Sequence, residues 1–94
     1  MIDSATRKRF EDALASGTLK DLADQMTAEG VSQAAIYHLF ESFWRFLGDA
    51  HRDADEEKLA CCLESIIGWC SSGHKWFDHY LTNEEIHAYR KTTT

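Results

Sequence analysis

The chain has 94 residues, of which sixteen are acidic and ten are Lys or Arg, so its formal net charge is −6. Binding to nucleic-acid phosphates or to an anionic membrane surface needs an excess of Lys and Arg, and this acidic balance counts against both kinds of partner. The length supports one domain with a single modest core, and no run approaches the roughly 20 apolar residues of a membrane-spanning helix.

The N-terminal residues and the cysteines fit a cytoplasmic protein. Residues Met1–Ser4 lack the basic and then apolar layout of a signal peptide. The cysteine count of three is odd, and Cys61 and Cys62 are adjacent, which favours a reducing compartment over a disulfide framework. We therefore expect a cytoplasmic protein that forms one α-helical domain over residues 1–94, with a frayed tail at 92–94.

The placement of glycine and the absence of proline predict the fold class. Four of the five glycines follow an apolar run with helical spacing, where the end of a helix favours a residue that tolerates a left-handed backbone: Gly17, Gly30, Gly48 and Gly73. Ser, Thr or Asp follows the first three within a few residues, as at the start of a new helix. The sequence predicts an all-α fold, a compact bundle of five to six short helices.

The first two predicted helices cover residues 4–16 and a segment from Thr18 to Gly30. Thr18 and Asp21 are spaced like a capping box at the start of the second helix. Apolar side chains recur on one face of each helix: Phe10, Ala13 and Leu14 in the first, and Leu19, Leu22, Ala23 and Met26 in the second. We expect these two faces to enter the core.

The third predicted helix begins after Ser32 and ends at Gly48. Ser32 is the expected N-cap, and Val31 can pack on Ile36 as a hydrophobic staple. A stripe with the spacing of a buried helix face follows, and Trp44 lies beside it: Ile36, Leu39, Phe40, Phe43 and Leu47.

An acidic connector is predicted from Asp49 to Glu57, before a fourth helix that Asp53 or Asp55 can cap. Gly68 is expected inside this helix, at a cost of about 1 kcal/mol relative to Ala. The apolar face of the helix is formed by Leu59, Cys62, Leu63, Ile66 and Cys70. Beyond Gly73 we expect a short aromatic helix and then a last helix from Thr82 to about Arg90, with Thr82 and Glu85 as its capping box.

The side-chain types suggest three kinds of site to consider: a zinc site, a calcium site and a cysteine nucleophile. Five residues of types that can bind zinc lie close together in the sequence: Cys61, Cys62, Cys70, His74 and His79. Their cysteines lack the spacing of two to four intervening residues with which structural zinc sites usually begin. A calcium-loop spacing is matched by Asp53, Asp55, Glu57 and Glu64, with Lys58 where that loop needs Gly. Cys70 and His74 supply the residue types of a cysteine nucleophile at the unfavourable end of a helix dipole. We predict that the cysteines pack in the core, with no metal, no cofactor and no enzymatic activity.

Residues 19–40, LKDLADQMTAEGVSQAAIYHLF, resemble the helix-turn-helix of the TetR family of bacterial repressors. The matching elements are Leu22-Ala23, Gly30-Val31-Ser32, and Ile36-Tyr37 with Phe40. The resemblance implies a helix that reads DNA, with these side chains facing the groove: Ser32, Gln33, Ala34, Tyr37 and His38. The helix has no Lys or Arg between Gln33 and Phe43, so DNA binding is the second of two functional hypotheses.

The first hypothesis is a non-enzymatic module that binds another protein. Large aromatic side chains, common anchors at interfaces, are numerous for such short helices: Trp44, Trp69, Trp76, Phe77 and Tyr80. An acidic connector beside an exposed aromatic side chain suits a basic protein partner, and self-association is the alternative. These features resemble small acidic bacterial immunity proteins, a class that implies neutralisation of a basic nuclease toxin. The predicted contact residues are Asp49, Asp53, Asp55, Glu56, Glu57, Trp76 and His79.

Overall fold

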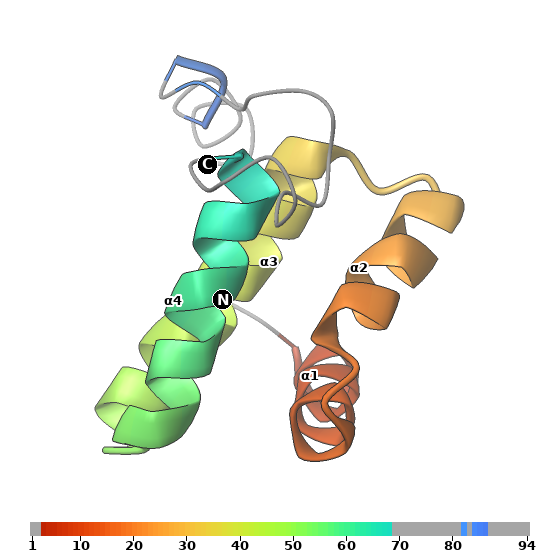
Figure 1. The fold of residues 1–94 in the computed structure, drawn as a ribbon. Helices are drawn as coiled ribbons and strands as arrows, with labels where there is room; N and C mark the ends of the chain where they lie inside the picture. The colour runs from red at the N-terminus through yellow and green to blue at the C-terminus, as the bar shows by residue number, and fades with distance from the viewer. Residues whose placement is uncertain (1–2, 69–81, 83, 87–94) are drawn as a thin grey trace.

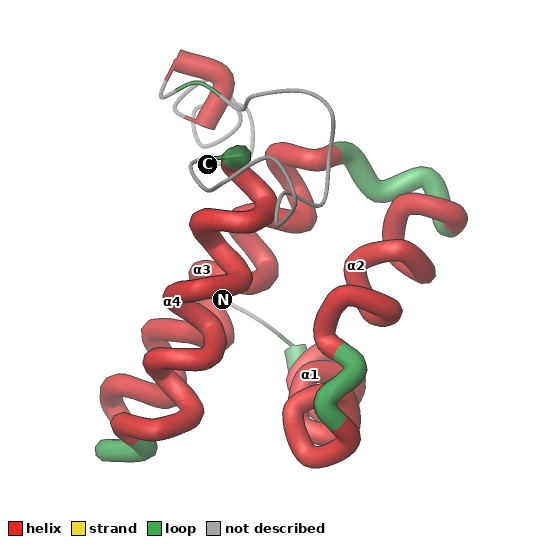
Figure 2. The backbone as a smooth tube through the Cα atoms, viewed as in Figure 1, coloured by secondary structure: helices red, strands yellow, loops and turns green. Residues whose placement is uncertain are grey.

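Four α-helices fill most of the chain that the computed structural model describes, which comprises residues 3–68, 82 and 84–86. They are α1 (Ser4–Ser16), α2 (Leu19–Ala28), α3 (Gln33–Asp49) and α4 (Asp53–Ile67), and residues 84–86 are also helical. These residues include no strand (Figure 2). The predicted all-α fold class is confirmed, and the predicted bounds of the first helix agree with α1.

The helices form two pairs. α3 and α4 lie side by side along their lengths and run in opposite directions, while α1 and α2 stand beside them (Figure 1). Three residues, 50–52, connect α3 to α4, and two residues, 17 and 18, connect α1 to α2. Such short connections keep neighbouring helices together in space, so each pair can bury one common apolar face.

Aromatic rings of α1 and α3 meet at the centre of the core. The Phe10 ring lies edge-on to Phe40 with 4.8 Å between centroids, and it stacks on Phe43 at 5.0 Å. The other buried members of this core are Ala13, Leu14, Leu19, Leu22, Ala23, Met26, Ile36, Leu47, Leu59, Cys62 and Ile66. Every member lies on a predicted apolar face, while Leu39 and Leu63 are half-buried against it.

Three helices end with the same hydrogen bonds. The residues Gly17, Gly30 and His51 adopt a left-handed backbone, with φ of 69°, 91° and 59°. The next amide in each case donates to a carbonyl five residues earlier: Thr18 to Ala13 at 2.9 Å, Val31 to Met26 at 3.0 Å, and Arg52 to Leu47 at 2.9 Å. This is the Schellman motif, which satisfies carbonyl groups that the helix end leaves open.

Two predictions about glycine are wrong. Gly48 lies inside α3, which continues to Asp49, and His51 takes the left-handed position instead. Gly68, expected inside the fourth helix, has φ of 98° and ends α4 after Ile67. A helical pattern that continues past a glycine does not show whether that glycine is helical, because the hydrogen bonds at the end decide it. Cys70, which was predicted on the apolar face of this helix, lies outside the described residues.

The predicted caps have mixed outcomes. Ser32 caps α3 as expected, since its Oγ accepts from the Ala35 amide at 3.2 Å. Thr82 and Glu85 form the expected capping box, in which the Glu85 amide donates to Thr82 Oγ1 at 3.2 Å. Thr18 stands at the N-cap of α2, but its side chain makes no capping hydrogen bond, so the predicted box with Asp21 is wrong. Gly73 and the predicted aromatic helix lie outside the described residues.

Candidate functional site

Five predicted contact residues come together where α3 ends and α4 begins. Asp49 is the last residue of α3, and the other four lie in the first turns of α4: Asp53, Asp55, Glu56 and Glu57. The three-residue connection and the opposite directions of the two helices place all five at one end of this pair (Figure 1). We call these five residues the acidic end.

The acidic end is helical and is not the predicted connector. Only Ala50, His51 and Arg52 lie between the helices. Carboxylates are favourable in the first turn of a helix because they face the positive end of its dipole, so Asp53, Asp55 and Glu56 favour helix here. Neither Asp53 nor Asp55 is the N-cap, because Arg52 takes that position without a side-chain capping bond.

Arg52 pairs with one residue of the acidic end. Its guanidinium makes two hydrogen bonds to the Glu11 carboxylate on α1, both of 2.9 Å, and its Nε donates to Asp55 Oδ2 at 3.1 Å. The hydrogen bonds to Glu11 are the main cause that raises the pKa of Arg52 above its ordinary value. Asp55 therefore has an internal counter-ion, and its charge is less available to a partner.

The other four carboxylates have no ion-pair partner within residues 3–68, 82 and 84–86. Asp49, Asp53 and Glu57 are exposed, and Glu56 is half-buried. Glu56 reaches across to α3, where its Oε2 occupies the space that a Cβ at position 48 would need. Gly48 therefore allows this carboxylate to approach the α3 backbone.

A shallow pocket of about 250 Å³ lies between these carboxylates and an aromatic side chain. It is lined by Trp44, Arg45, Asp49 and Glu56. Trp44 is half-buried and packs against the core, while the Arg45 side chain is 65% exposed and comes within 3.9 Å of Glu41. The pocket thus combines an aromatic side chain with two carboxylates that lack ion-pair partners in the described chain, a chemistry that suits a cationic side chain.

The predicted aromatic contacts and the aromatic side chain at the pocket are different residues. Trp76 and His79 lie outside the described residues, and Trp44 was not among the predicted contacts. Arg45 and Asp49 are four residues apart, as are Trp44 and Gly48, so helical spacing could have indicated a common edge of α3. The approach of Glu56 depends on tertiary packing, for which the sequence gives no signal.

The residues that the TetR resemblance would place in a DNA groove have contacts within the protein. Gln33 Nε2 donates to the Ile66 carbonyl at 2.8 Å, and His38 Nε2 lies 3.2 Å from the Ile86 carbonyl oxygen. Ser32 is exposed and caps α3, and Ala34 and Tyr37 are half-buried. The first turns of α3 are thus held against α4 and residue 86, which does not favour insertion of this face into DNA.

The part of the chain that the structure describes contains no group of side chains that fits either metal hypothesis. Cys61 is exposed and Cys62 is buried, while Cys70, His74 and His79 lie outside the described residues. The calcium spacing falls along the helix α4 and not on a loop. No three His, Cys, Asp or Glu side chains within residues 3–68, 82 and 84–86 are grouped so that they could hold a metal ion.

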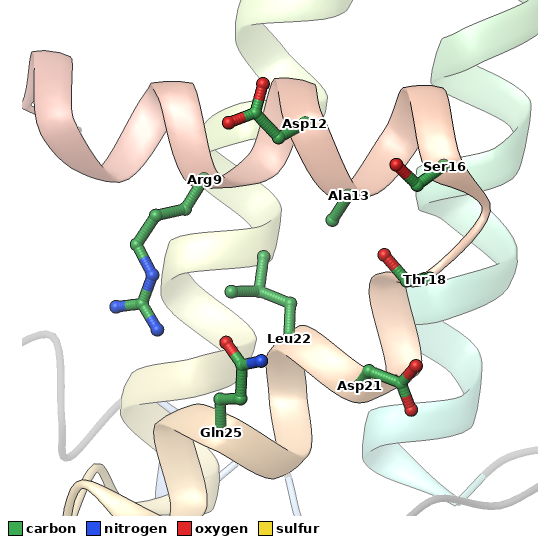
Figure 3. Close-up of a pocket in the computed structure, with 8 residues that line it drawn as sticks. All are labelled: Arg9, Asp12, Ala13, Ser16, Thr18, Asp21, Leu22 and Gln25. Carbon is green, nitrogen blue, oxygen red and sulfur yellow. The ribbon is translucent and has the colours of Figure 1, made fainter.

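A second pocket, of about 270 Å³, opens between α1 and α2 (Figure 3). Its lining mixes charges of both signs with hydroxyl, amide and apolar groups: Arg9, Asp12, Ala13, Ser16, Thr18, Asp21, Leu22 and Gln25. Arg9 is already paired with Glu29, at 2.9 and 3.2 Å, and Asp12 with Lys8 at 3.4 Å. This mixture does not single out one class of ligand.

Comparisons of the chain with protein-family models, curated proteins and solved structures find no match. None of the helices within residues 3–68 and 84–86 has the length and apolar character that a bilayer crossing requires.

Proposed function

We propose that this protein is a non-enzymatic binding module whose acidic end receives a basic surface of a protein partner. The observation that carries the proposal is the pocket at which Trp44 meets Asp49 and Glu56. A lysine or arginine of the partner that enters this pocket would gain an ion pair with a carboxylate and a contact with the indole ring. The immunity-like reading, in which the partner is a basic bacterial toxin, is the narrower form of this proposal.

The charge and the pocket would contribute in different ways. A net charge of −6 attracts a basic protein over distances of about 10 Å at moderate salt and so speeds association. The aromatic side chain would instead slow dissociation, because buried Trp side chains often carry much of the affinity of an interface. The partner should therefore show both a salt-dependent association rate and a strong dependence on Trp44.

The first test compares two variants that lose the same charge. Asp49→Asn with Glu56→Gln neutralises the two carboxylates of the pocket, and Asp21→Asn with Glu64→Gln neutralises two exposed carboxylates elsewhere. Each chain is immobilised and exposed to lysate of its own source at low and high salt, and the retained proteins are identified by mass spectrometry. We expect a basic protein to be retained at low salt by the wild type and the control variant, and much less by the pocket variant.

Kinetics with the identified partner then test the mechanism. The pocket variant should associate about five-fold more slowly at low salt, with a weaker salt dependence than the wild type. Arg45→Gln should associate faster, because it removes a positive charge that lines the pocket. Equal retention by the pocket and control variants would refute the role of the acidic end, and retention of nucleic acid in place of protein would favour the helix-turn-helix hypothesis.

A further inference from the structure

A groove on another part of the surface has a different chemistry from the acidic end. It lies between the turn that joins α1 to α2 and the middle of α4, and has a volume of about 420 Å³, larger than either pocket described above. Its lining residues are Leu14, Gly17, Leu19, Lys20, Lys58, Cys61 and Cys62. This volume falls within the range of small-molecule sites, and its walls are mainly apolar. We call it the lysine groove.

The charge of the lysine groove is opposite to that of the whole chain. None of the seven residues named above is acidic, although the chain has sixteen acidic residues. Lys20 comes from α2 and Lys58 from α4, so the two ammonium groups are supplied from different helices. An apolar groove with two cationic side chains is complementary to a molecule that has an apolar chain and an anionic end.

Neither lysine forms a buried or strong ion pair within the described residues. Lys20 pairs with Asp24 at 3.0 Å, but this pair is more than half exposed and joins residues one helical turn apart, a type that adds little stability. Lys58 is exposed and has no ion-pair partner in the described chain. A carboxylate can therefore replace water or Asp24 at these two groups without breaking a buried network.

We propose that the lysine groove binds a small amphiphilic carboxylate, a molecule with one alkyl chain that ends in a carboxylate. The alkyl chain lies over Leu14, Leu19 and Cys62, and the carboxylate is held by Lys20 and Lys58. This site is independent of the acidic end and of its protein partner. It adds a small-molecule ligand to a chain for which composition indicates only macromolecular binding.

Cys61 provides a built-in reporter of occupancy. Its thiol is exposed and lines the groove, whereas its neighbour Cys62 is buried. Burial raises the pKa of the Cys62 thiol to about 12, so Cys62 reacts slowly with an alkylating reagent at neutral pH. A ligand in the groove should therefore slow the alkylation of Cys61, which tandem mass spectrometry can assign to that residue.

The experiment uses three probes of eight carbons each, titrated into the full chain below their solubility limits and micelle concentrations. Octanoate carries the proposed carboxylate, octan-1-ol is neutral and octylamine is cationic. Affinity is measured by amide chemical-shift changes, which also locate the site, and by protection of Cys61 from iodoacetamide. We expect octanoate to bind about five-fold more tightly than octan-1-ol, since each lysine adds a surface ion pair. Octylamine should bind more weakly than either.

Two charge variants complete the test. Lys20→Gln with Lys58→Gln should lower the affinity for octanoate about five-fold, to that of octan-1-ol. Arg7→Gln with Lys8→Gln removes the same charge from exposed residues near the start of α1, away from the groove, and should leave the affinity unchanged. Both substituted pairs are on the surface, and circular dichroism checks that each variant folds.

Three results would overturn the proposal. The first is equal affinity for octanoate and octylamine, which would indicate a charge-independent apolar patch. The second is a set of chemical-shift changes confined to residues outside the groove. The third is a doubled molecular mass by light scattering that protects Cys61 without any ligand, which would show that a second copy of the chain occupies the groove.

Discussion

Arg52 links residues that are far apart in the sequence. Its bidentate contact with Glu11 joins α1 to the turn between α3 and α4, and its contact with Asp55 orients the first turn of α4. The side chain is 34% exposed, so solvent weakens both ion pairs. The planar guanidinium nevertheless matches a carboxylate with two parallel hydrogen bonds, which a lysine cannot reproduce.

Arg52→Gln should lower the free energy of unfolding by about 1 kcal/mol, because it removes the contacts with both carboxylates. The measurement is urea denaturation followed by circular dichroism. Arg45→Gln is the matched control, since that side chain is 65% exposed and approaches Glu41 only at 3.9 Å. A loss that is equal in the two variants would show that Arg52 acts through overall charge and not through its own contacts.

At the level of the helices, the sequence predicts interiors better than ends. Every member of the core cluster lies at a position that the apolar periodicity predicts to be buried. The prediction succeeds because a helix that buries one face has apolar residues at the spacing of that face. The predictions at Gly48 and Gly68 are wrong for a physical reason. A Schellman motif forms where the chain must turn, and at the end of α3 the left-handed residue is His51, which sequence alone does not distinguish from its neighbours.

His51→Gly should raise the free energy of unfolding by about 0.5 kcal/mol. A left-handed backbone costs a residue with a Cβ about 1 kcal/mol, and the greater freedom of glycine in the unfolded chain offsets part of the gain. Gly17→Ala tests the same effect in the opposite direction. A Cβ at position 17 meets only open space, so the φ cost of about 1 kcal/mol, partly offset by the lower freedom of alanine in the unfolded chain, leaves an expected loss of about 0.5 kcal/mol. Thermal unfolding of both variants measures the two changes, and shifts of the same sign would contradict this account.

At the level of the whole molecule, the sequence shows which side chains are charged but not which of them lie together on the folded surface. The acidic residues from 49 to 57 are neighbours in the sequence, so their clustering at one end was predictable. The pocket beside Trp44 was not, because it depends on where Glu56 meets α3. The lysine groove likewise combines residues of α2 and α4 that no local pattern connects.

Gly48→Ala should separate the stability of the fold from the proposed function. Alanine favours the helix by about 0.5 kcal/mol, and the atom that its Cβ would displace is the flexible end of Glu56. The variant should therefore be at least as stable as the wild type in urea denaturation, yet bind the partner of the acidic end more weakly. Undiminished binding by the stable variant would argue against a role for the position of Glu56.

The three-residue link between α3 and α4 also bears on how the chain folds. The two helices are neighbours in the sequence and pack along their lengths. Their contacts therefore form without the closure of a long loop. Proteins dominated by such local contacts reach the native state in microseconds to milliseconds. The hairpin that displays the acidic end is thus also a unit whose assembly demands little chain entropy.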